Sequence, residues 1–345
     1  MWQFWLMFLL AACGVAMPSR LPRSQAKLVW VCVGAIFAVL MGFRHEVGGD
    51  WFTYLPSFQD VGMVDFGEVI SKPDPGYYGL NWLVGRLGGN IYWVNFVCAA
   101  ILMWGTVVFC RRQPNPWLAL LVSVPYMLIV VGMGYTRQSV ALGFALLGLV
   151  ALGDGRVRRF VLLVAIGALF HRSAVLLLPI AALAASKNRI LTVLLVLVST
   201  LLMYYLLLVD SAELLWRNYV DTQMESQGGA IRVAMNALPA FILVIYRKRL
   251  VPDPVERRLW LWLAALAMVC IPLIALASTA VDRVALYLIP IQLFVFARLP
   301  RMARGPGVRT PIVLSVVGYY ATVQYVWLNY AANAREWLPY QFMPT

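Results

Sequence analysis

The stretch Pro116-Trp-Leu-Ala-Leu-Leu-Val-Ser-Val-Pro-Tyr-Met-Leu-Ile-Val-Val-Gly-Met133 contains no charged side chain. A transmembrane helix needs about 20 predominantly apolar residues, within a range of roughly 17 to 25. Residues 116–133 fall within that range, and an uninterrupted apolar run of this length is typical of a membrane span. The stretch therefore predicts a helix that crosses a lipid bilayer.

Similar apolar runs recur along the whole chain. Its 345 residues are 62% hydrophobic and only 12% charged, whereas soluble domains are about 25% charged. The sequence therefore predicts an all-α, polytopic integral membrane protein, organised as a single transmembrane domain over residues 1–345. About twelve spans are expected, near residues 2–17, 27–43, 90–110, 116–133, 138–153, 158–171, 173–186, 190–209, 231–247, 259–277, 283–298 and 310–330.

The basic residues have the distribution of a membrane topology. The net charge is +13, and 19 of the 28 basic residues lie in six clusters in alternate loops. The positive-inside rule makes those loops cytoplasmic, so both termini are expected on the periplasmic side of a bacterial inner membrane. No nucleic-acid partner is expected. The clusters are Arg20, Arg23 and Lys27; Arg111 and Arg112; Arg156, Arg158 and Arg159; Lys187 and Arg189; Arg247, Lys248, Arg249, Arg257 and Arg258; and Arg298, Arg301, Arg304 and Arg309.

Two long outer loops are expected, at about residues 44–90 and 210–230. The basic loops all lie on the cytoplasmic side only if residues 75–89 do not cross the membrane. A crossing there would place Arg111 and Arg112 on the outer side. We therefore interpret residues 75–89 as an amphipathic or re-entrant segment within the first outer loop.

Five isolated arginines lie at the outer ends of the apolar runs. Inserting an arginine well inside a membrane helix costs roughly 2.5 to 3.5 kcal/mol, so such residues usually face a wet cavity or a partner. Snorkelling at the membrane edge is the alternative. Guanidinium groups offer paired donors that suit phosphate or pyrophosphate, so we expect the set to bind pyrophosphate. Its members are Arg44, Arg137, Arg172, Arg232 and Arg283.

The two histidines of the chain, His45 and His171, each adjoin one of these arginines, Arg44 and Arg172. A lone histidine is often a structural residue, but these positions also fit a shared site at the outer face. Side chains with the usual spacing of metal ligands are absent from the sequence. We predict no metal site and no cofactor.

Carboxylates stand in the same region. Glu46 and Asp50 flank a pair of glycines, and either could act as a general base toward an attacking hydroxyl. Asp50 could equally cap a short helix that starts at Trp51. Asp282 is either an ion-pair partner of its neighbour Arg283 or a second candidate base.

Six short motifs follow one another along the chain: Arg44-His-Glu-Val-Gly-Gly-Asp-Trp-Phe-Thr-Tyr54, Gly76-Tyr-Tyr-Gly-Leu80, Tyr135-Thr-Arg-Gln-Ser139, Phe170-His-Arg-Ser173, Asp282-Arg-Val-Ala-Leu-Tyr287 and Trp337-Leu-Pro-Tyr340. In this order they resemble the motifs of the EpsG family, which comprises Wzy-like exopolysaccharide or O-antigen polymerases. The family commonly has threonine where this chain has Gly49, and an arginine at the position of Arg172 is not expected throughout it.

This resemblance implies a glycosyltransferase of GT-C-like architecture that works without a metal. It would join lipid-linked oligosaccharide repeat units, with a growing chain on undecaprenyl pyrophosphate as donor and a single repeat unit as acceptor. Membrane lipid and a chain-length regulator protein are further expected partners. The resemblance does not specify the sugars, the linkage or the stereochemistry.

The site residues fall into three groups under this resemblance. The arginines, above all Arg44, Arg137 and Arg283, would stabilise the charge on the departing pyrophosphate. His171, Asp50 and Glu46 are the candidates for the general base. A third group would orient sugar or phosphate oxygens: Gln138, Tyr135 and His45.

Other functions stay open at this point. A lipid-linked oligosaccharide flippase or another transporter would also have many spans and a cationic cavity, although transporters often show repeat symmetry and polar residues near the midplane. An O-antigen ligase would use the same lipid donor and an outer-face site. The arginine set argues against a purely structural subunit.

Overall fold

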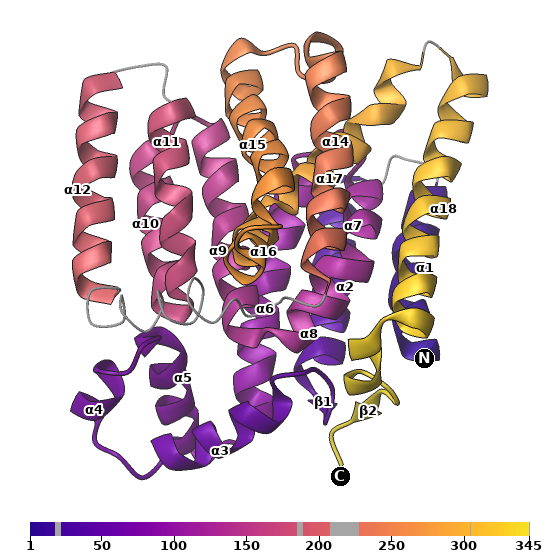
Figure 1. The fold of residues 1–345 in the computed structure, drawn as a ribbon. Coiled ribbons are helices and arrows are strands. Elements are labelled where there is room, and N and C mark those ends of the chain that lie inside the picture. Colours follow the sequence, from indigo (N-terminus) through magenta and orange to yellow (C-terminus); the bar gives the residue numbers. More distant parts are fainter. Residues whose placement is uncertain (18–21, 185–188, 208–227, 304, 345) are drawn as a thin grey trace.

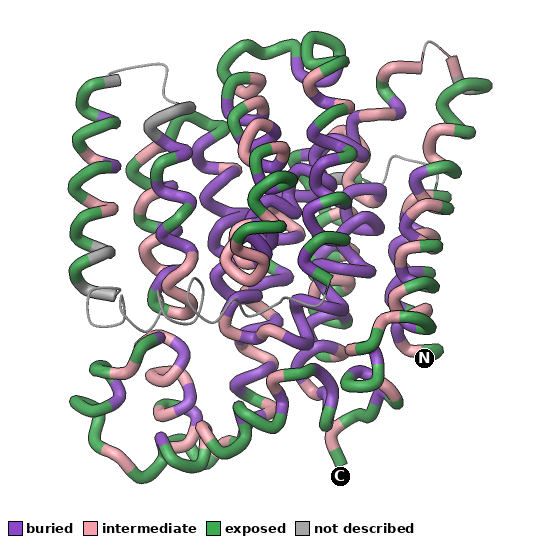
Figure 2. The backbone as a smooth tube through the Cα atoms, in the orientation of Figure 1, coloured by how far each residue is buried: buried purple, intermediate pink, exposed green. Residues whose placement is uncertain are grey.

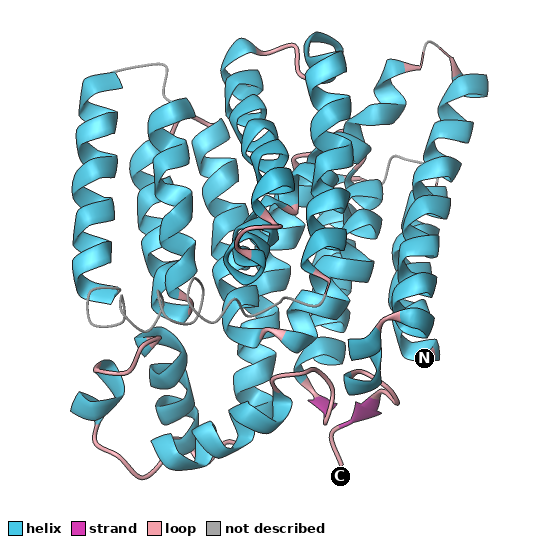
Figure 3. Cartoon of the chain, viewed as in Figure 1, coloured by secondary structure: helices cyan, strands magenta, loops and turns pink. Residues whose placement is uncertain are grey.

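The computed structural model describes residues 1–17, 22–184, 189–207, 228–303 and 305–344. Most of the chain is helical, and the long helices lie side by side as a bundle (Figures 1 and 3). Within the described residues, the strands β1 (Arg44–His45) and β2 (Gln341–Phe342) form a single two-stranded sheet. The all-α membrane fold predicted from the apolar runs is confirmed.

The first part of the bundle consists of α1 (Trp2–Ala16), α2 (Arg23–Gly42), α6 (Ile91–Arg111), α7 (Pro116–Ser123), the π-helix η1 (Val124–Val131) and α8 (Gly132–Gly134). The middle part consists of α9 (Thr136–Gly153), α10 (Val157–Phe170), the 3-10 helix η2 (Arg172–Leu177), α11 (Leu178–Ala184) and α12 (Arg189–Leu207). The last part consists of α14 (Gly229–Leu250), α15 (Pro254–Leu273), α16 (Ser278–Leu288), α17 (Pro290–Arg298), the 3-10 helix η5 (Leu299–Met302) and α18 (Pro306–Tyr330). Every one of the twelve sequence ranges expected to span the membrane contains helix.

Within the part of the chain that the structure describes, six helices are long and apolar enough to cross a membrane, or seven if the bent pair of α16 with α17 and η5 counts as one span. That pair bends by 42° at a break before Pro290, where proline removes a backbone donor. Several other helices are short, such as the 14-residue α10, and α15 has charged residues near its start. The count of twelve crossings therefore stays a prediction.

The two ends of the bundle differ. Both termini lie at the end that also has α3 (Trp51–Val61), α4 (Phe66–Ile70) and α5 (Pro75–Arg86), whereas the connections from α14 to α15 and from α17 to α18 lie at the opposite end (Figure 1). Those connections contain predicted basic clusters.

Residues 75–89 were expected to stay out of the bilayer. Most of this segment forms α5, which lies outside the main bundle (Figure 1). The second predicted long loop, at 210–230, falls almost entirely outside the described residues.

The core is formed by the helices that begin at Pro116 and Thr136. Of the apolar span at 116–134, 94% is buried, against 22% for the span in α18, and Figure 2 shows the same contrast between the inner and outer helices. Helix α9 packs closely on α6, since a Cβ added to Gly105 would lie 2.2 Å from the carbonyl oxygen of Gly143. Small residues allow this close approach in membrane helices. The first turn of α9 is thereby held within the core.

The C-terminal segment is tied to the chain after α2. Strand β1 pairs antiparallel with β2, with Arg44 opposite Phe342. The hydroxyl of Tyr340 donates to the carbonyl of Leu40 at 2.7 Å, and the indole N–H of Trp337 donates to the carbonyl of Ile129 at 3.1 Å. These contacts hold the C-terminal segment against α2 and η1.

Candidate active site

Side chains from five parts of the chain meet near the end of the bundle that has α3 and α5. They come from the start of α3, the residue before α5, the first turn of α9, the junction of α10 with η2, and α16. Their contacts join most of the residues expected to act, together with several that were not expected.

Asp50 lies at the N-terminus of α3, which starts at Trp51 as predicted. Its carboxylate makes no capping hydrogen bond, so the capping role is wrong for this side chain. It instead accepts a hydrogen bond from the hydroxyl of Tyr54, with 3.0 Å between the oxygens. Residues four apart lie on the same face of a helix, and this spacing orients the carboxylate.

Arg137 meets a carboxylate that the sequence analysis did not select. Its Nη1 donates to Oδ2 of Asp74 at 2.8 Å, and its Cζ lies 5.7 Å from the ring centroid of Tyr54. The peptide N–H of Arg172 approaches the other oxygen of Asp74 at 3.4 Å. The side chain of Arg137 is 29% exposed and that of Asp74 only 5%. Asp74 therefore fixes Arg137 while part of Arg137 stays accessible.

His171 and Arg283 are also brought together, although 112 positions separate them in sequence. Nη1 of Arg283 lies 3.1 Å from Nε2 of His171. On the other side of the imidazole, Nδ1 lies 2.6 Å from Oγ of Ser173, which in turn lies 3.1 Å from the hydroxyl of Tyr287. The imidazole is thus held at both nitrogens.

Arg232 forms a separate, closed pair. It donates to the carboxylate of Asp282 and to the hydroxyl of Tyr126 at 2.8 Å, and its Cζ lies 5.0 Å from the centroid of that tyrosine ring. The side chain of Arg232 is 3% exposed. Asp282 therefore has an ion-pair partner on α14, in addition to its position beside Arg283 in the chain.

Tyr126 lies in the π-helix η1, which begins next to Pro125. Single π-helical turns often occur at functional sites, and a proline inside a helix removes one backbone donor. The hydroxyl of Tyr126 meets the guanidinium of Arg232 from this irregular turn. The pair of Arg232 and Asp282 therefore links η1, α14 and α16.

Arg44 is enclosed by the protein, at 1% exposure. Its guanidinium donates to the carbonyls of Met41 and Val47, at 2.5 and 3.0 Å, and to the hydroxyl of Thr136 at 2.8 Å. Burial lowers the pKa of Arg44 to about 10, which leaves it charged at neutral pH. In the structure, Arg44 joins the end of α2 to the start of α9.

The remaining predicted residues lie around this cluster. Nδ1 of His45 lies 2.7 Å from the hydroxyl of Tyr92, and its Nε2 lies 3.8 Å from the carboxylate of Glu46, which is exposed. The amide of Gln138 donates to the carbonyl of Arg283 at 3.5 Å. Tyr135 lies at the break between α8 and α9.

The loop before Asp50 depends on one glycine. Gly48 has a φ of +105°, and a Cβ there would lie 2.1 Å from the carbonyl oxygen of Met133. The peptide N–H of Gly48 donates to the carbonyl of Glu336 at 2.8 Å. Only glycine adopts such a conformation at little cost, so Gly48 lets the loop lie between α8 and the 3-10 helix η6 (Ala332–Glu336).

The surroundings change the acidity of Asp50. Burial raises the pKa of the Asp50 carboxyl, and the Tyr54 hydroxyl together with the guanidinium groups of Arg137, Arg283 and Arg44 partly opposes this shift. A carboxylate with a raised pKa is a stronger base than an ordinary aspartate. The environment therefore suits proton transfer from a hydroxyl.

Sequence reasoning missed Asp74 and the partners of the imidazole. Asp74 precedes Pro75 at the start of a helix, a position where aspartate is expected to cap. Tyr54, Ser173 and Tyr287 stand inside the quoted motifs, but no sequence pattern showed what they contact. The one signal that could have found Asp74 is its position as an acidic residue two positions before the motif that begins at Gly76.

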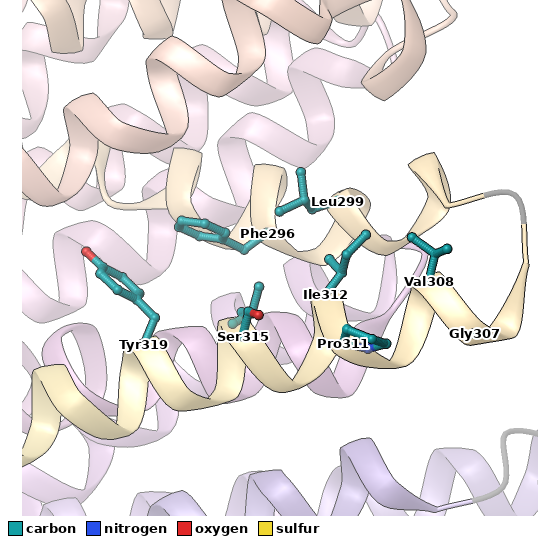
Figure 4. A pocket seen from close by; sticks show the side chains of 9 residues that line it. Phe296, Leu299, Gly307, Val308, Pro311, Ile312, Ser315 and Tyr319 are labelled. Atoms are coloured by element: carbon teal, nitrogen blue, oxygen red, sulfur yellow. The ribbon is translucent and has the colours of Figure 1, made fainter.

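A groove lies away from this cluster, and the described residues include no group of metal ligands. Among the described residues, no three His, Cys, Asp or Glu side chains form a group that could hold a metal ion. A groove of about 460 Å³ lies between α17 with η5 and the first half of α18 (Figure 4). Phe296, Ile312 and Tyr319 are among the residues that line it. It contains none of the predicted site residues.

The fold and this cluster define a polytopic helical membrane protein that brings guanidinium groups, carboxylates and an imidazole together near one end of its bundle. The model of the EpsG family matches residues 27–342, so the chain belongs to the EpsG family. Members of this family are membrane proteins associated with polysaccharide polymerisation of the glycosyltransferase type. Neither the curated proteins nor the solved structures yielded a match.

Proposed function

We propose that this protein is a polysaccharide polymerase that joins undecaprenyl-pyrophosphate-linked oligosaccharide repeat units at the outer face of a bacterial inner membrane. The growing chain is the donor, and a single lipid-linked repeat unit is the acceptor. Both termini and α3 to α5 are periplasmic in this proposal, the chain crosses the membrane about twelve times in a GT-C-like arrangement, and a chain-length regulator is a further partner.

In the proposed reaction, a hydroxyl oxygen of the acceptor sugar attacks the anomeric carbon of the donor. The bond from that carbon to the pyrophosphate oxygen breaks, and its electron pair leaves with the pyrophosphate. A positioned base takes the hydroxyl proton, a contribution of about 10² to 10⁴ in rate. Arg137 and Arg283 stabilise the charge on the leaving group, since preorganised donors act most strongly where charge develops.

One structural observation supports this proposal, in addition to membership of the EpsG family. Two candidate bases, Asp50 and His171, lie in the same cluster as two candidate pyrophosphate ligands, Arg137 and Arg283. These residues come from separate parts of the chain, namely α3, α9, α16 and the end of α10. Glycosyl transfer from a pyrophosphate needs both kinds of group within reach of one another. Arg44 and Arg232 have internal partners, so we assign them to hold the site together.

The proposal is tested in cells that lack the gene. Surface glycan is resolved by gel, and any accumulated lipid-linked unit is labelled from the periplasm to establish its side of the membrane. We expect the ladder of long chains to disappear and single repeat units to accumulate on the outer face. Units that accumulate on the cytoplasmic face would instead identify a transporter, and normal repeat units with finished chains left unattached would identify a ligase.

Complementation then tests the site. Arg137→Ala leaves the buried carboxylate of Asp74 without its ion-pair partner, so chain extension is compared at equal amounts of inserted, folded protein. On that basis the variant should restore no chain extension. The matched control is Arg112→Ala, because Arg112 also pairs with an aspartate, Asp154, at 3.0 Å but is exposed in the loop that follows α6. Wild-type chain lengths in the Arg137 variant would contradict the assignment.

A further inference from the structure

The imidazole of His171 has hydrogen-bond partners that constrain its proton. Nη1 of Arg283 lies 3.1 Å from Nε2. A guanidinium offers N–H donors and no acceptor, so Nε2 must be the accepting nitrogen in this contact. A neutral imidazole has one protonated nitrogen, and in this arrangement it is Nδ1.

The other side of the imidazole is consistent with this tautomer. Nδ1 lies 2.6 Å from Oγ of Ser173, so the Nδ1 proton can be donated to that hydroxyl. Oγ lies 3.1 Å from the hydroxyl of Tyr287, which can accept the Ser173 proton in turn. The peptide N–H of Ser173 also approaches Nδ1 at 3.4 Å, a contact in which Nδ1 would have to accept. The contact from Arg283 to Nε2 is shorter, at 3.1 Å, and we give it the greater weight because hydrogen bonds weaken with length.

A proton on Nε2 would conflict with this arrangement. It would place an N–H against the N–H of Arg283 and remove the acceptor that holds the guanidinium. A general base at His171 would have to accept the substrate proton at this same nitrogen.

We infer that His171 is a positioning residue, a neutral imidazole that holds Arg283 through Nε2, and that Asp50 is the base that takes the proton. This inference rests on the proposed polymerase reaction for its catalytic half only. Glu46 is exposed and faces His45, whereas the Asp50 carboxylate is oriented by Tyr54 and lies in the field of Arg137 and Arg283. In the balanced step, the acceptor hydroxyl proton passes to Asp50 as the new glycosidic bond forms and the pyrophosphate leaves.

Two isosteric variants separate positioning from base catalysis. His171→Gln places an amide oxygen where Nε2 stood, so it can still accept from Arg283 but cannot act as a base near neutral pH. His171→Asn places its amide nearer to Nδ1 and loses that acceptor. We expect chain extension by the Gln variant within about tenfold of wild type and a loss of about 10² or more for Asn, as for other lost transition-state contacts.

The assay uses membrane vesicles that contain the full chain, with lipid-linked repeat units extracted from cells lacking the gene. A loss of about 10² to 10⁴ in both variants would identify His171 as the base and overturn the inference. Full rates in both would show that His171 does not position Arg283, which also overturns it. The amount of folded protein is measured for each variant by its thermal melt in detergent.

Nitrogen-15 NMR spectroscopy tests the tautomer of His171 without a substitution at that residue. The chain has two histidines, so labelled wild-type protein gives two sets of imidazole signals, and His45→Gln identifies the set from His171. We expect a neutral imidazole protonated at Nδ1 between about pH 6 and 8, where an ordinary histidine titrates. A proton on Nε2 overturns the inference. If wild-type vesicles fail to extend chains, the proposed function fails while this measurement still decides the tautomer.

Discussion

Two arginine–aspartate pairs in the same region of the bundle have different surroundings. Arg137 donates to Asp74 and is 29% exposed, whereas Arg232 donates to Asp282 and is 3% exposed. Arg232 also donates to a tyrosine hydroxyl and lies against the same ring. A guanidinium with buried, internal partners stabilises the fold, while one that is partly exposed can also bind a substrate phosphate. The comparison favours Arg137 as a substrate ligand and Arg232 as a structural residue.

The largest expected effect tests the architectural pair. Arg232→Met removes the guanidinium from the buried carboxylate of Asp282, and breaking a buried pair in this way costs about 3 to 5 kcal/mol. Thermal unfolding in detergent measures the loss of stability. Arg112→Met is the control, because exposed pairs contribute about 0 to 1 kcal/mol. If the Arg232 variant melts like wild type, this pair does not support the fold.

The next effect tests the pair of Arg137 and Asp74, in which Arg137 is partly exposed. Arg137→Lys keeps a positive charge but replaces the planar pair of donors with a point charge. We expect chain extension to fall by about 10² to 10³, the usual cost of losing one transition-state donor, with the melting temperature nearly unchanged. Vesicle extension assays measure the rate. A fully active but unstable lysine variant would reverse the roles of the two pairs.

A smaller effect concerns the loop that places Asp50 beside Arg137. Gly48→Ala puts a Cβ against the carbonyl of Met133 at a positive φ. The backbone conformation costs about 1 to 3 kcal/mol, and the close approach to Met133 should add to this loss. Gly88→Ala is the matched control, since Gly88 has a φ of +74° but nothing within 4 Å of an added Cβ. Thermal melts of the two variants are compared. Equal losses would mean that the close approach to Met133 has no effect.

The smallest effect is a shift in pH dependence. The base must be ionised to accept a proton, and burial raises the pKa of the Asp50 carboxyl. As the pH is lowered, the rate should therefore begin to fall at a pH above the ordinary aspartate pKa of about 3.9. Stability has the opposite sign. Folding favours the protonated form when the folded pKa is raised, so the contribution of Asp50 to stability is greatest below its unfolded pKa and is lost as the pH rises through the folded pKa. The pH–rate profile of wild-type vesicles tests this. A rate that is constant down to about pH 4 would contradict it.

Part of the candidate site was predictable from the sequence. Isolated arginines at the ends of apolar runs are costly, and this cost marked Arg137 and Arg283 without any knowledge of the fold. The pairing of these residues was not predictable. Asp74 and Arg137 are 63 positions apart and His171 and Arg283 are 112 apart, and no local pattern encodes contacts over such distances.

The sequence by itself determined the class of the molecule, because runs such as residues 116–133 have no charged side chain and must be buried in protein or lipid. It also showed a pair of glycines, residues of unusual backbone freedom, directly before Asp50. The tertiary structure decided which arginine is enclosed and which is accessible. Burial and hydrogen-bond partners depend on how distant helices pack, and they distinguish Arg44 and Arg232 from Arg137 although all three are arginines near the ends of apolar runs.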